Sequence, residues 1–185
     1  MTRRKLSSKS KSSKRSRTRT PKRTDQKGKT VEHHHLLARI ETALCPDEKD
    51  THKMEIMLET LAKDIGMERL GDAQIFYVNS KEKDKVGMSG ILPIQTSHIS
   101  FHFWKYPIRH TLHNDKSNCL VQFDLYTCGN LNKSKIKTVL ELFEQFDPQH
   151  ANVTLINRRY GMKIDSLTEW DATSRKWKDF VANYN

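Results

Sequence analysis

Residues 87–104 read G-M-S-G-I-L-P-I-Q-T-S-H-I-S-F-H-F-W, and residues 119–129 read C-L-V-Q-F-D-L-Y-T-C-G. Apolar and β-branched residues alternate with polar ones through much of both segments, which is typical of strands with one buried face. A strand normally carries few reactive side chains, yet small nucleophiles and imidazoles recur here. This concentration predicts a functional site on neighbouring strands.

The alternation in the strand after Ser97 separates a polar face from an apolar one. The polar face carries His98, Ser100, His102 and Trp104, and the apolar face carries Ile99, Phe101 and Phe103. If this strand pairs with residues 119–128, the carboxylate of Asp124 and the thiol of Cys128 join two imidazoles on one surface. Ser97 has the parity of the apolar face, so a role in the site requires a turn, a bulge or a chain break there.

The flanking segments predict the rest of the fold. The expected strands are 31–41, 73–78, 88–94, 98–104, 119–128 and 153–157, and the expected helices are 47–65, 133–146 and 165–184. The order strand, helix, strands, helix, strand predicts an antiparallel or mixed α+β sandwich. Trp170 and Trp177, seven residues apart, are expected to pack the last helix onto the body. No glycine-rich phosphate loop follows any strand, which argues against a nucleotide-binding fold.

The excess positive charge lies in the first thirty residues. Residues 1–30 hold 13 Lys and Arg side chains and one acid, Asp25, whereas the whole chain has a formal net charge of +11. The sequence thus predicts a disordered basic tail, followed by one nearly neutral domain at residues 31–185. The tail is a candidate for binding nucleic acid or another polyanion. A solubilising extension without a dedicated partner is the equally open alternative.

The numbers and positions of the cysteines and histidines indicate the compartment of the protein and whether it binds a metal. The three cysteines do not form a disulfide framework, and their odd number leaves at least one thiol unpaired, so a cytoplasmic, reducing compartment is the simplest interpretation. No apolar run approaches the length of a membrane span, so no membrane association is expected. The imidazoles of residues 33–35 alternate between the faces of a strand and cannot all bind one ion, so no metal is predicted.

These segments resemble the short prokaryotic form of the pyruvoyl-dependent S-adenosylmethionine decarboxylases. The resemblance is densest in S-H-I-S-F-H-F-W at residues 97–104 and in D-L-Y-T-C-G at residues 124–129, a paired signature that is quite specific. It extends more weakly to residues 34–41 and 157–162. The implied fold is an S-adenosylmethionine decarboxylase-like α+β sandwich of antiparallel or mixed sheet, with helices packed on one face.

The resemblance implies that the chain cuts itself between residues 96 and 97. Ser97 matches the serine that attacks the carbonyl of Thr96 and becomes a pyruvoyl group at the new N-terminus. Ser89 and His102 match residues that assist this processing by hydrogen bonding and proton removal. Cys128 matches the residue that protonates the substrate carbon after carbon dioxide leaves.

A pyruvoyl ketone captures a substrate amine and accepts the electrons that decarboxylation releases, as other carbonyl cofactors do. The implied protein is therefore a zymogen that matures into a lyase of polyamine (spermidine) biosynthesis. The resemblance also implies a homo-oligomer, such as a dimer of processed protomers.

Some positions depart from the family pattern. Thr96 stands where the family commonly has Glu, Tyr106 stands where an acid binds the ribose of the substrate, and residues 105–118 are longer than the usual turn. Trp104 still matches an aromatic residue on the adenine side. Ribose hydroxyls without their acceptor cost about 1–3 kcal/mol each. Another amine substrate such as ornithine or arginine therefore stays open, as does an unprocessed, non-catalytic relative whose tail binds a polyanion.

Overall fold

The computed structural model of the chain describes residues 31–159 and 161–180. The predicted basic tail, residues 1–30, lies outside the described residues. The strands are β1 (His34–Thr42), β2 (Gln74–Val78), β3 (Gly87–Ile94), β4 (Ser97–Trp104), β5 (Cys119–Thr127), β6 (Pro148–Asn157), β7 (Lys163–Asp171) and β8 (Lys176–Phe180). The helices are α1 (Thr51–Asp64) and α2 (Lys133–Leu142), with short 3-10 turns η1 (Glu48–Asp50), η2 (Lys83–Lys85), η3 (Arg109–Thr111) and η4 (Phe143–Phe146).

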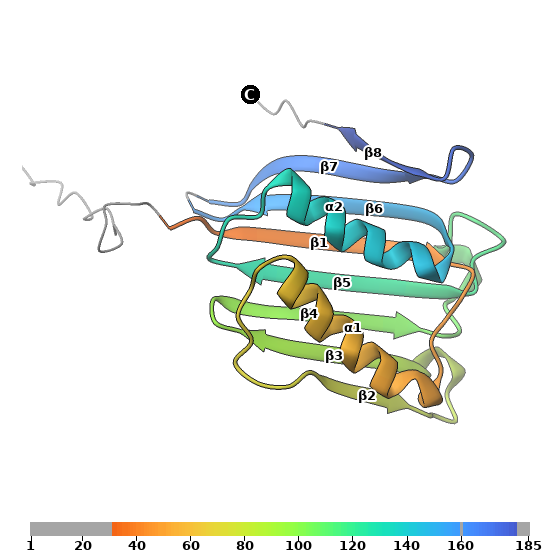
Figure 1. The fold of residues 1–185 in the computed structure, drawn as a ribbon. Helices are drawn as coiled ribbons and strands as arrows, with labels where there is room; N and C mark the ends of the chain where they lie inside the picture. Colours follow the sequence, from red (N-terminus) through yellow and green to blue (C-terminus); the bar gives the residue numbers. More distant parts are fainter. Residues whose placement is uncertain (1–30, 160, 181–185) are drawn as a thin grey trace, which may run out of the picture. The chain divides into compact units, whose positions relative to one another are not determined.

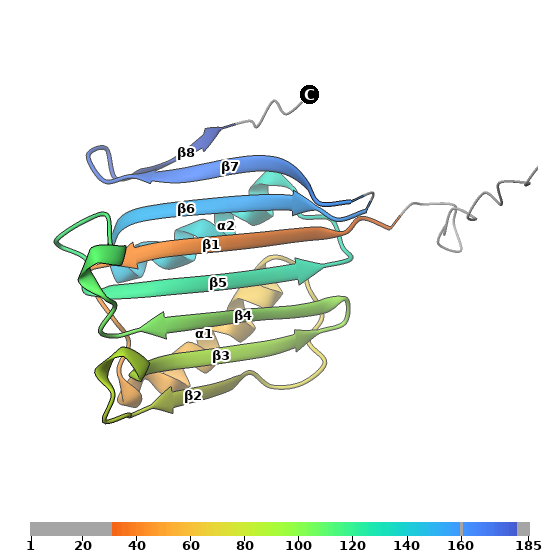
Figure 2. The same cartoon turned by 180° about the vertical axis from the view of Figure 1, so that it is seen from behind.

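The described strands form one antiparallel sheet in the order β2-β3-β4-β5-β1-β6-β7-β8. The first strand of the sequence, β1, therefore lies between β5 and β6 in the middle of the sheet. Both helices lie on the same face (Figure 1), and the view from behind shows that neither α1 nor α2 covers the opposite face of the sheet (Figure 2). This arrangement confirms the predicted α+β class with helices packed on one face.

The core lies between the sheet and the two helices. Buried residues of α1 recur at helical spacing, namely Met54, Met57, Leu58, Leu61 and Ala62. They meet alternate residues of the strands, such as Leu36 and Ile40 of β1 and Phe101 and Phe103 of β4, all nearly inaccessible to solvent. The two-residue period of the strands therefore directs the other set of side chains, including those of the candidate site, to the uncovered face.

The helix predicted at residues 165–184 is wrong, because the described part of this segment is the hairpin of β7 and β8. Trp170 and Trp177 are cross-strand partners, with ring centroids 5.0 Å apart in an edge-to-face arrangement. A spacing of seven fits two turns of a helix, but it also fits two residues that face each other across a turn. Asp171 accepts hydrogen bonds from the backbone N–H groups of Thr173 and Ser174, which stabilises that turn. Residues 181–184 lie outside the described residues.

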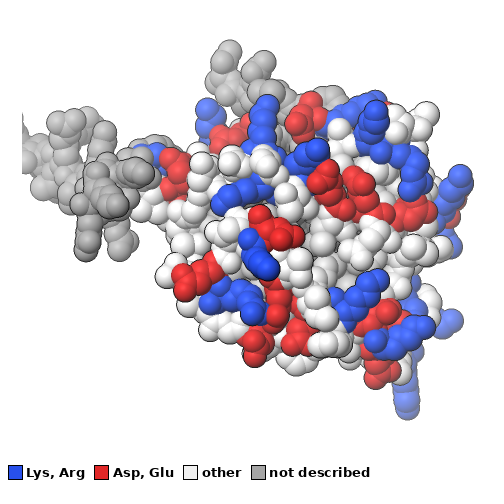
Figure 3. All heavy atoms as spheres, viewed as in Figure 1, with Lys and Arg blue, Asp and Glu red and all other residues white. Residues whose placement is uncertain are grey.

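The surface charge, the pairing of the cysteines and the length of the helices can each be compared with the sequence predictions. Acidic and basic side chains are interspersed on the face that bears the helices (Figure 3), in agreement with a domain of little net charge. Cys45 and Cys119 form a disulfide, and Cys128 is a free thiol. The sequence left open which thiol is unpaired and favoured reduced cysteines, so this disulfide differs from that expectation. Within the described ranges, no helix is long and apolar enough to cross a membrane.

Candidate active site

The predicted cleavage position lies in the tight turn between β3 and β4. Ile94 pairs with Ser97, so Gln95 and Thr96 alone form the connection. The φ angle of Ser97 is 155°, in a region of backbone conformation that favours glycine. A residue other than glycine held there stores about 1–3 kcal/mol of strain. The hairpin thus places a strained serine directly after the carbonyl of Thr96.

The irregular backbone at Ser97 explains how this residue lies near the uncovered face, although the alternation of the strand assigns it to the apolar face. Its cross-strand partner Thr127 is fully buried on the helix side, whereas Ser97 is half-buried. The hydroxyl of Ser97 lies 3.2 Å from Nδ1 of His98, a residue of the uncovered face. The departure from regular strand geometry that the sequence required is therefore present at this residue.

Cys128 lies beside Thr96, the residue before the predicted cleavage position. Its backbone N–H donates to the carbonyl oxygen of Thr96 over 3.3 Å. Its Sγ is 3.4 Å from Nδ1 of His33, and the phenol of Tyr126 is 3.0 Å from the same nitrogen. Burial raises the pKa of Tyr126, and the adjacent Cys128 raises it further, so the phenol stays protonated. We call Thr96, Ser97 and Cys128 the cleavage half-site.

Ser89 and His102 form a second pair. They are cross-strand partners on β3 and β4, and Ser89 Oγ lies 2.6 Å from Nδ1 of His102. The imidazole also contacts Trp104, with ring centroids 5.0 Å apart. Close approach of the strands is possible at Gly87, because a Cβ there would lie 1.9 Å from the carbonyl oxygen of Phe103. We call Ser89, His102 and Trp104 the Ser89–His102 half-site.

The two half-sites are far apart within one chain. His102 follows Ser97 by five residues on the same strand, which corresponds to about 16 Å at the rise of an extended strand. Of the two imidazoles of β4 that the sequence placed with the thiol, His98 bonds to Asp124 and His102 bonds to Ser89. The thiol of Cys128 contacts His33 instead. One chain therefore does not bring Ser89 and His102 to the bond that they were expected to help cut.

A shallow groove of about 470 Å³ on the uncovered face extends from His102 of β4 across β5 and β1 to Thr154 of β6. Its walls include Ser100 and His102 of β4 and Asp124 of β5. This volume falls in the range of small-molecule sites. Tyr106, expected at the place of a ribose-binding acid, is 48% exposed and lines a different depression next to Cys45 and Arg109. Among the described residues, no group of three or more His, Cys, Asp or Glu side chains could hold a metal ion.

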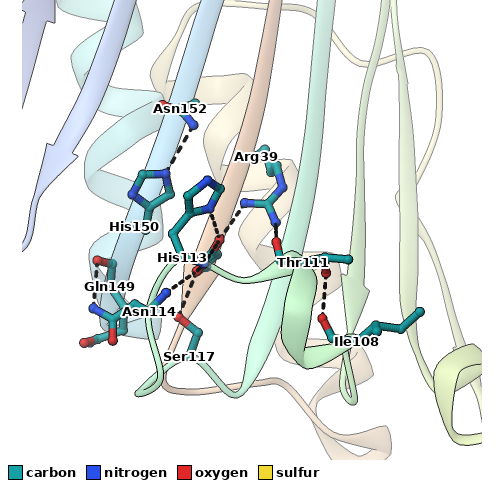
Figure 4. A network of polar contacts seen from close by, with 10 residues as sticks. Arg39, Ile108, Thr111, His113, Asn114, Ser117, Gln149, His150 and Asn152 are labelled. Atoms are coloured by element: carbon teal, nitrogen blue, oxygen red, sulfur yellow. Dashed lines mark hydrogen bonds and ion pairs between the residues drawn. The ribbon is translucent and has the colours of Figure 1, made fainter.

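A buried carboxylate that the sequence did not single out anchors the long connection at residues 105–118. Glu41 is completely buried and accepts hydrogen bonds from Arg39, from the hydroxyl of Ser117 and from the backbone and ring of His113. Figure 4 shows these donors converging from β1 and from the connection. Burial alone would raise the pKa of Glu41, but the hydrogen bonds outweigh it and lower the pKa from 4.5 to about 2.

Replacing Glu41 with glutamine is expected to destabilise the domain, because Arg39 loses its partner and buried donors lose an acceptor. The free energy of unfolding should fall by about 2–4 kcal/mol in urea titrations at neutral pH. Glu48→Gln, at an exposed glutamate of η1, is the matched control and should stay within about 0.5 kcal/mol of the wild type. Equal stability of the Glu41 and Glu48 variants would contradict the anchoring role.

The lowered pKa of Glu41 also sets the direction of a pH effect. A carboxyl whose pKa is lower in the folded chain than in the unfolded chain stabilises the fold fully above the unfolded value. That contribution is lost as the pH falls from about 4.5 toward 2. The stability difference between wild type and Glu41→Gln should therefore shrink through this window.

Comparison with known proteins finds similarity to one family of enzymes. A model of the S-adenosylmethionine decarboxylase family matches residues 35–159. An S-adenosylmethionine decarboxylase proenzyme of Pyrococcus horikoshii is 33% identical over 132 residues, which is 70% of this chain and 79% of that protein. An S-adenosylmethionine decarboxylase proenzyme of Pyrococcus abyssi is 33% identical over 159 residues, 84% of this chain and 96% of that protein.

Proposed function

Because the chain belongs to the S-adenosylmethionine decarboxylase family and is a decarboxylase, we propose that it matures by cutting its own backbone between Thr96 and Ser97. The observation that carries this proposal is the strained hairpin turn, in which the hydroxyl of Ser97 adjoins a carbonyl that already accepts a hydrogen bond from Cys128. The proenzyme names of the relatives support it. The pyruvoyl group that would result supplies a ketone able to capture an amine and accept electrons.

Individual residues of the chain are assigned to self-cleavage and to decarboxylation. Ser97 supplies the nucleophile, Thr96 supplies the acyl group that leaves, and the backbone N–H of Cys128 stabilises negative charge on the carbonyl oxygen. The thiol of Cys128 delivers a proton to the substrate carbon once carbon dioxide has left. A thiol suits this task because its pKa can be tuned toward neutrality by its surroundings.

S-adenosylmethionine is the proposed substrate, and polyamine synthesis is the proposed use of the product. The names of the relatives support this substrate, and the groove beside Asp124 has a suitable size. Tyr106 in place of an acid keeps a basic amino acid as the second candidate. Carbon dioxide release from S-adenosylmethionine, ornithine and arginine distinguishes them: release from ornithine or arginine alone would refute the first choice.

We further propose that a second copy of the chain completes each site. The cleavage half-site and the Ser89–His102 half-site are about 16 Å apart in one chain, so neither Ser89 nor His102 reaches the scissile bond of its own chain. The uncovered sheet face also exposes apolar side chains, including Phe76 and Ile91. A copy packed against this face would bury them and bring the partner's His102 to Ser97.

Mixing two inactive variants tests this arrangement. Neither Ser97→Ala nor His102→Ala is expected to mature alone. When the two are produced together, the His102→Ala chain should be cut, because its own Ser97 meets the partner's His102. A size tag on one variant identifies the cut chain by intact mass. Absence of cutting in a mixture whose chains demonstrably associate would show that the site does not form between copies.

Maturation itself is tested by the intact mass of the purified wild-type protein after reduction of the Cys45–Cys119 disulfide, which would otherwise hold the two fragments together. Two fragments that meet between residues 96 and 97, with the second beginning in a pyruvoyl group, are the expected result. A single chain of 21.7 kDa after prolonged incubation would refute self-cleavage.

A further inference from the structure

Ser97, His98 and Asp124 are linked by hydrogen bonds in that order. His98 Nδ1 is 3.2 Å from Ser97 Oγ, and His98 Nε2 is 3.0 Å from one oxygen of Asp124. The other oxygen of Asp124 is 2.7 Å from Nε2 of His35. A hydroxyl, an imidazole and a carboxylate in this sequence form the arrangement that activates serine nucleophiles in unrelated hydrolases.

The partners of the two imidazoles fix where their protons lie. An ionised carboxylate only accepts hydrogen bonds, so the nitrogens of His98 and His35 that face Asp124 carry hydrogen. Nδ1 of a neutral His98 is then free to accept the proton of Ser97. On the far side of His35, Nδ1 lies 3.5 Å from the guanidinium of Arg158, which only donates. Each residue in this series of hydrogen bonds therefore faces a group that can donate or accept as the series requires.

We propose that His98 is the general base and acid of the first step of self-cleavage, and that Asp124 and His35 are its positioning residues. This inference rests on the proposed function and concerns the formation of the ester. The later elimination, which converts the ester into the pyruvoyl group, is the step assigned to the partner's His102. The basis of the inference is distance: His98 touches the hydroxyl of Ser97, whereas His102 of the same chain is about 16 Å away.

The step balances without any further reagent. The hydroxyl proton of Ser97 moves to Nδ1 of His98 while Oγ bonds to the carbonyl carbon of Thr96. The carbonyl oxygen becomes an oxyanion, which the N–H of Cys128 stabilises. When the oxyanion collapses, the carbon–nitrogen bond between residues 96 and 97 breaks. The nitrogen of Ser97 takes the proton back from His98, leaving an ester and a free amine.

The test is the rate of self-cleavage of the full chain, measured as the intact mass of samples in which the Cys45–Cys119 disulfide has been reduced. His98→Ala and His98→Gln should both slow cleavage by about 100-fold or more, the usual contribution of a positioned base. Glutamine can still donate a hydrogen bond to Asp124 but cannot take up a proton. Added imidazole should restore cleavage to the alanine variant, which requires that the variant be folded. His52→Ala, at an exposed histidine of α1, is the matched control and should cleave like the wild type.

Hydroxylamine separates the two steps, because it cuts esters and not ordinary peptide bonds. A His102→Ala chain should accumulate the ester and be cut by hydroxylamine. A His98→Ala chain should stay intact under the same treatment. Cleavage of both His98 variants at the wild-type rate would overturn the inference and leave the proposed function standing. An intact wild-type chain would instead overturn the proposed function.

Asp124 is tested as a positioning residue through non-additivity. Asp124→Asn alone should slow cleavage strongly, because an amide can present a donor to Nε2 and favour the wrong tautomer of His98. In a His98→Ala background the same change should have little further effect, since the two residues act as a unit. Additive losses in the double variant would show that Asp124 acts through the fold and not through His98.

Discussion

A Ser97→Ala protein is expected to remain one uncut chain of 21.7 kDa and to release no carbon dioxide from S-adenosylmethionine. Alanine has no oxygen to attack the carbonyl of Thr96, so neither the ester nor the pyruvoyl group can form. The loss of activity should be about 10⁶-fold or more, which brings the reaction to its uncatalysed rate. Intact mass and carbon dioxide release measure the two effects separately.

The matched control for this change is Ser134→Ala. Ser134 is an exposed serine in the first turn of α2, away from the sheet face that carries the site. This variant should mature and turn over like the wild type. Fragments from the Ser97→Ala chain, or turnover by it, would refute a mechanism that depends on the hydroxyl of residue 97.

Cys128→Ala is expected to separate maturation from catalysis. The contact that stabilises the carbonyl of Thr96 comes from the backbone N–H of residue 128, which alanine retains. The chain should therefore still be cut, while decarboxylation falls by about 10²–10⁴-fold for want of the proton donor. Cys128→Ser should recover little activity, because a hydroxyl is a much weaker acid than a thiol. An uncut Cys128→Ala chain, or one with full turnover, would contradict this division of roles.

The sequence predicted most elements because their periodicity is unambiguous. The strand at residues 119–127 alternates cleanly, and α1 repeats its apolar residues at three and four positions. The helix predicted at residues 165–184 is wrong, since two tryptophans seven residues apart fit both a helix and a hairpin. Only pairing with β6 on the neighbouring side of the sheet decides between them, and that pairing is not visible in local sequence.

The candidate site was predictable in composition but not in arrangement. The resemblance to a known family indicated Ser97, His102 and Cys128, yet the distance between the half-sites follows from the register of β3, β4 and β5. Glu41 was missed because an acid next to apolar residues at the end of a strand gives no signal of burial. Apart from Arg39, its donors come from residues about seventy positions away.

The position of β1 between β5 and β6 means that the sheet has to fold before the chain is cut. A cut after residue 96 leaves β1, β2 and β3 in one fragment and the other described strands in the second. Three pairs of neighbouring strands then join the two fragments, namely β3 with β4, β5 with β1, and β1 with β6. They stay together as one cooperative body without any peptide link, and the Cys45–Cys119 disulfide also joins them because each fragment carries one of its cysteines. Once the fragments are denatured and this disulfide is reduced, they must find each other in solution, so recovery becomes a second-order reaction that dilution slows. Under reducing conditions, the uncut precursor is therefore the only form that can assemble this sheet as a single molecule.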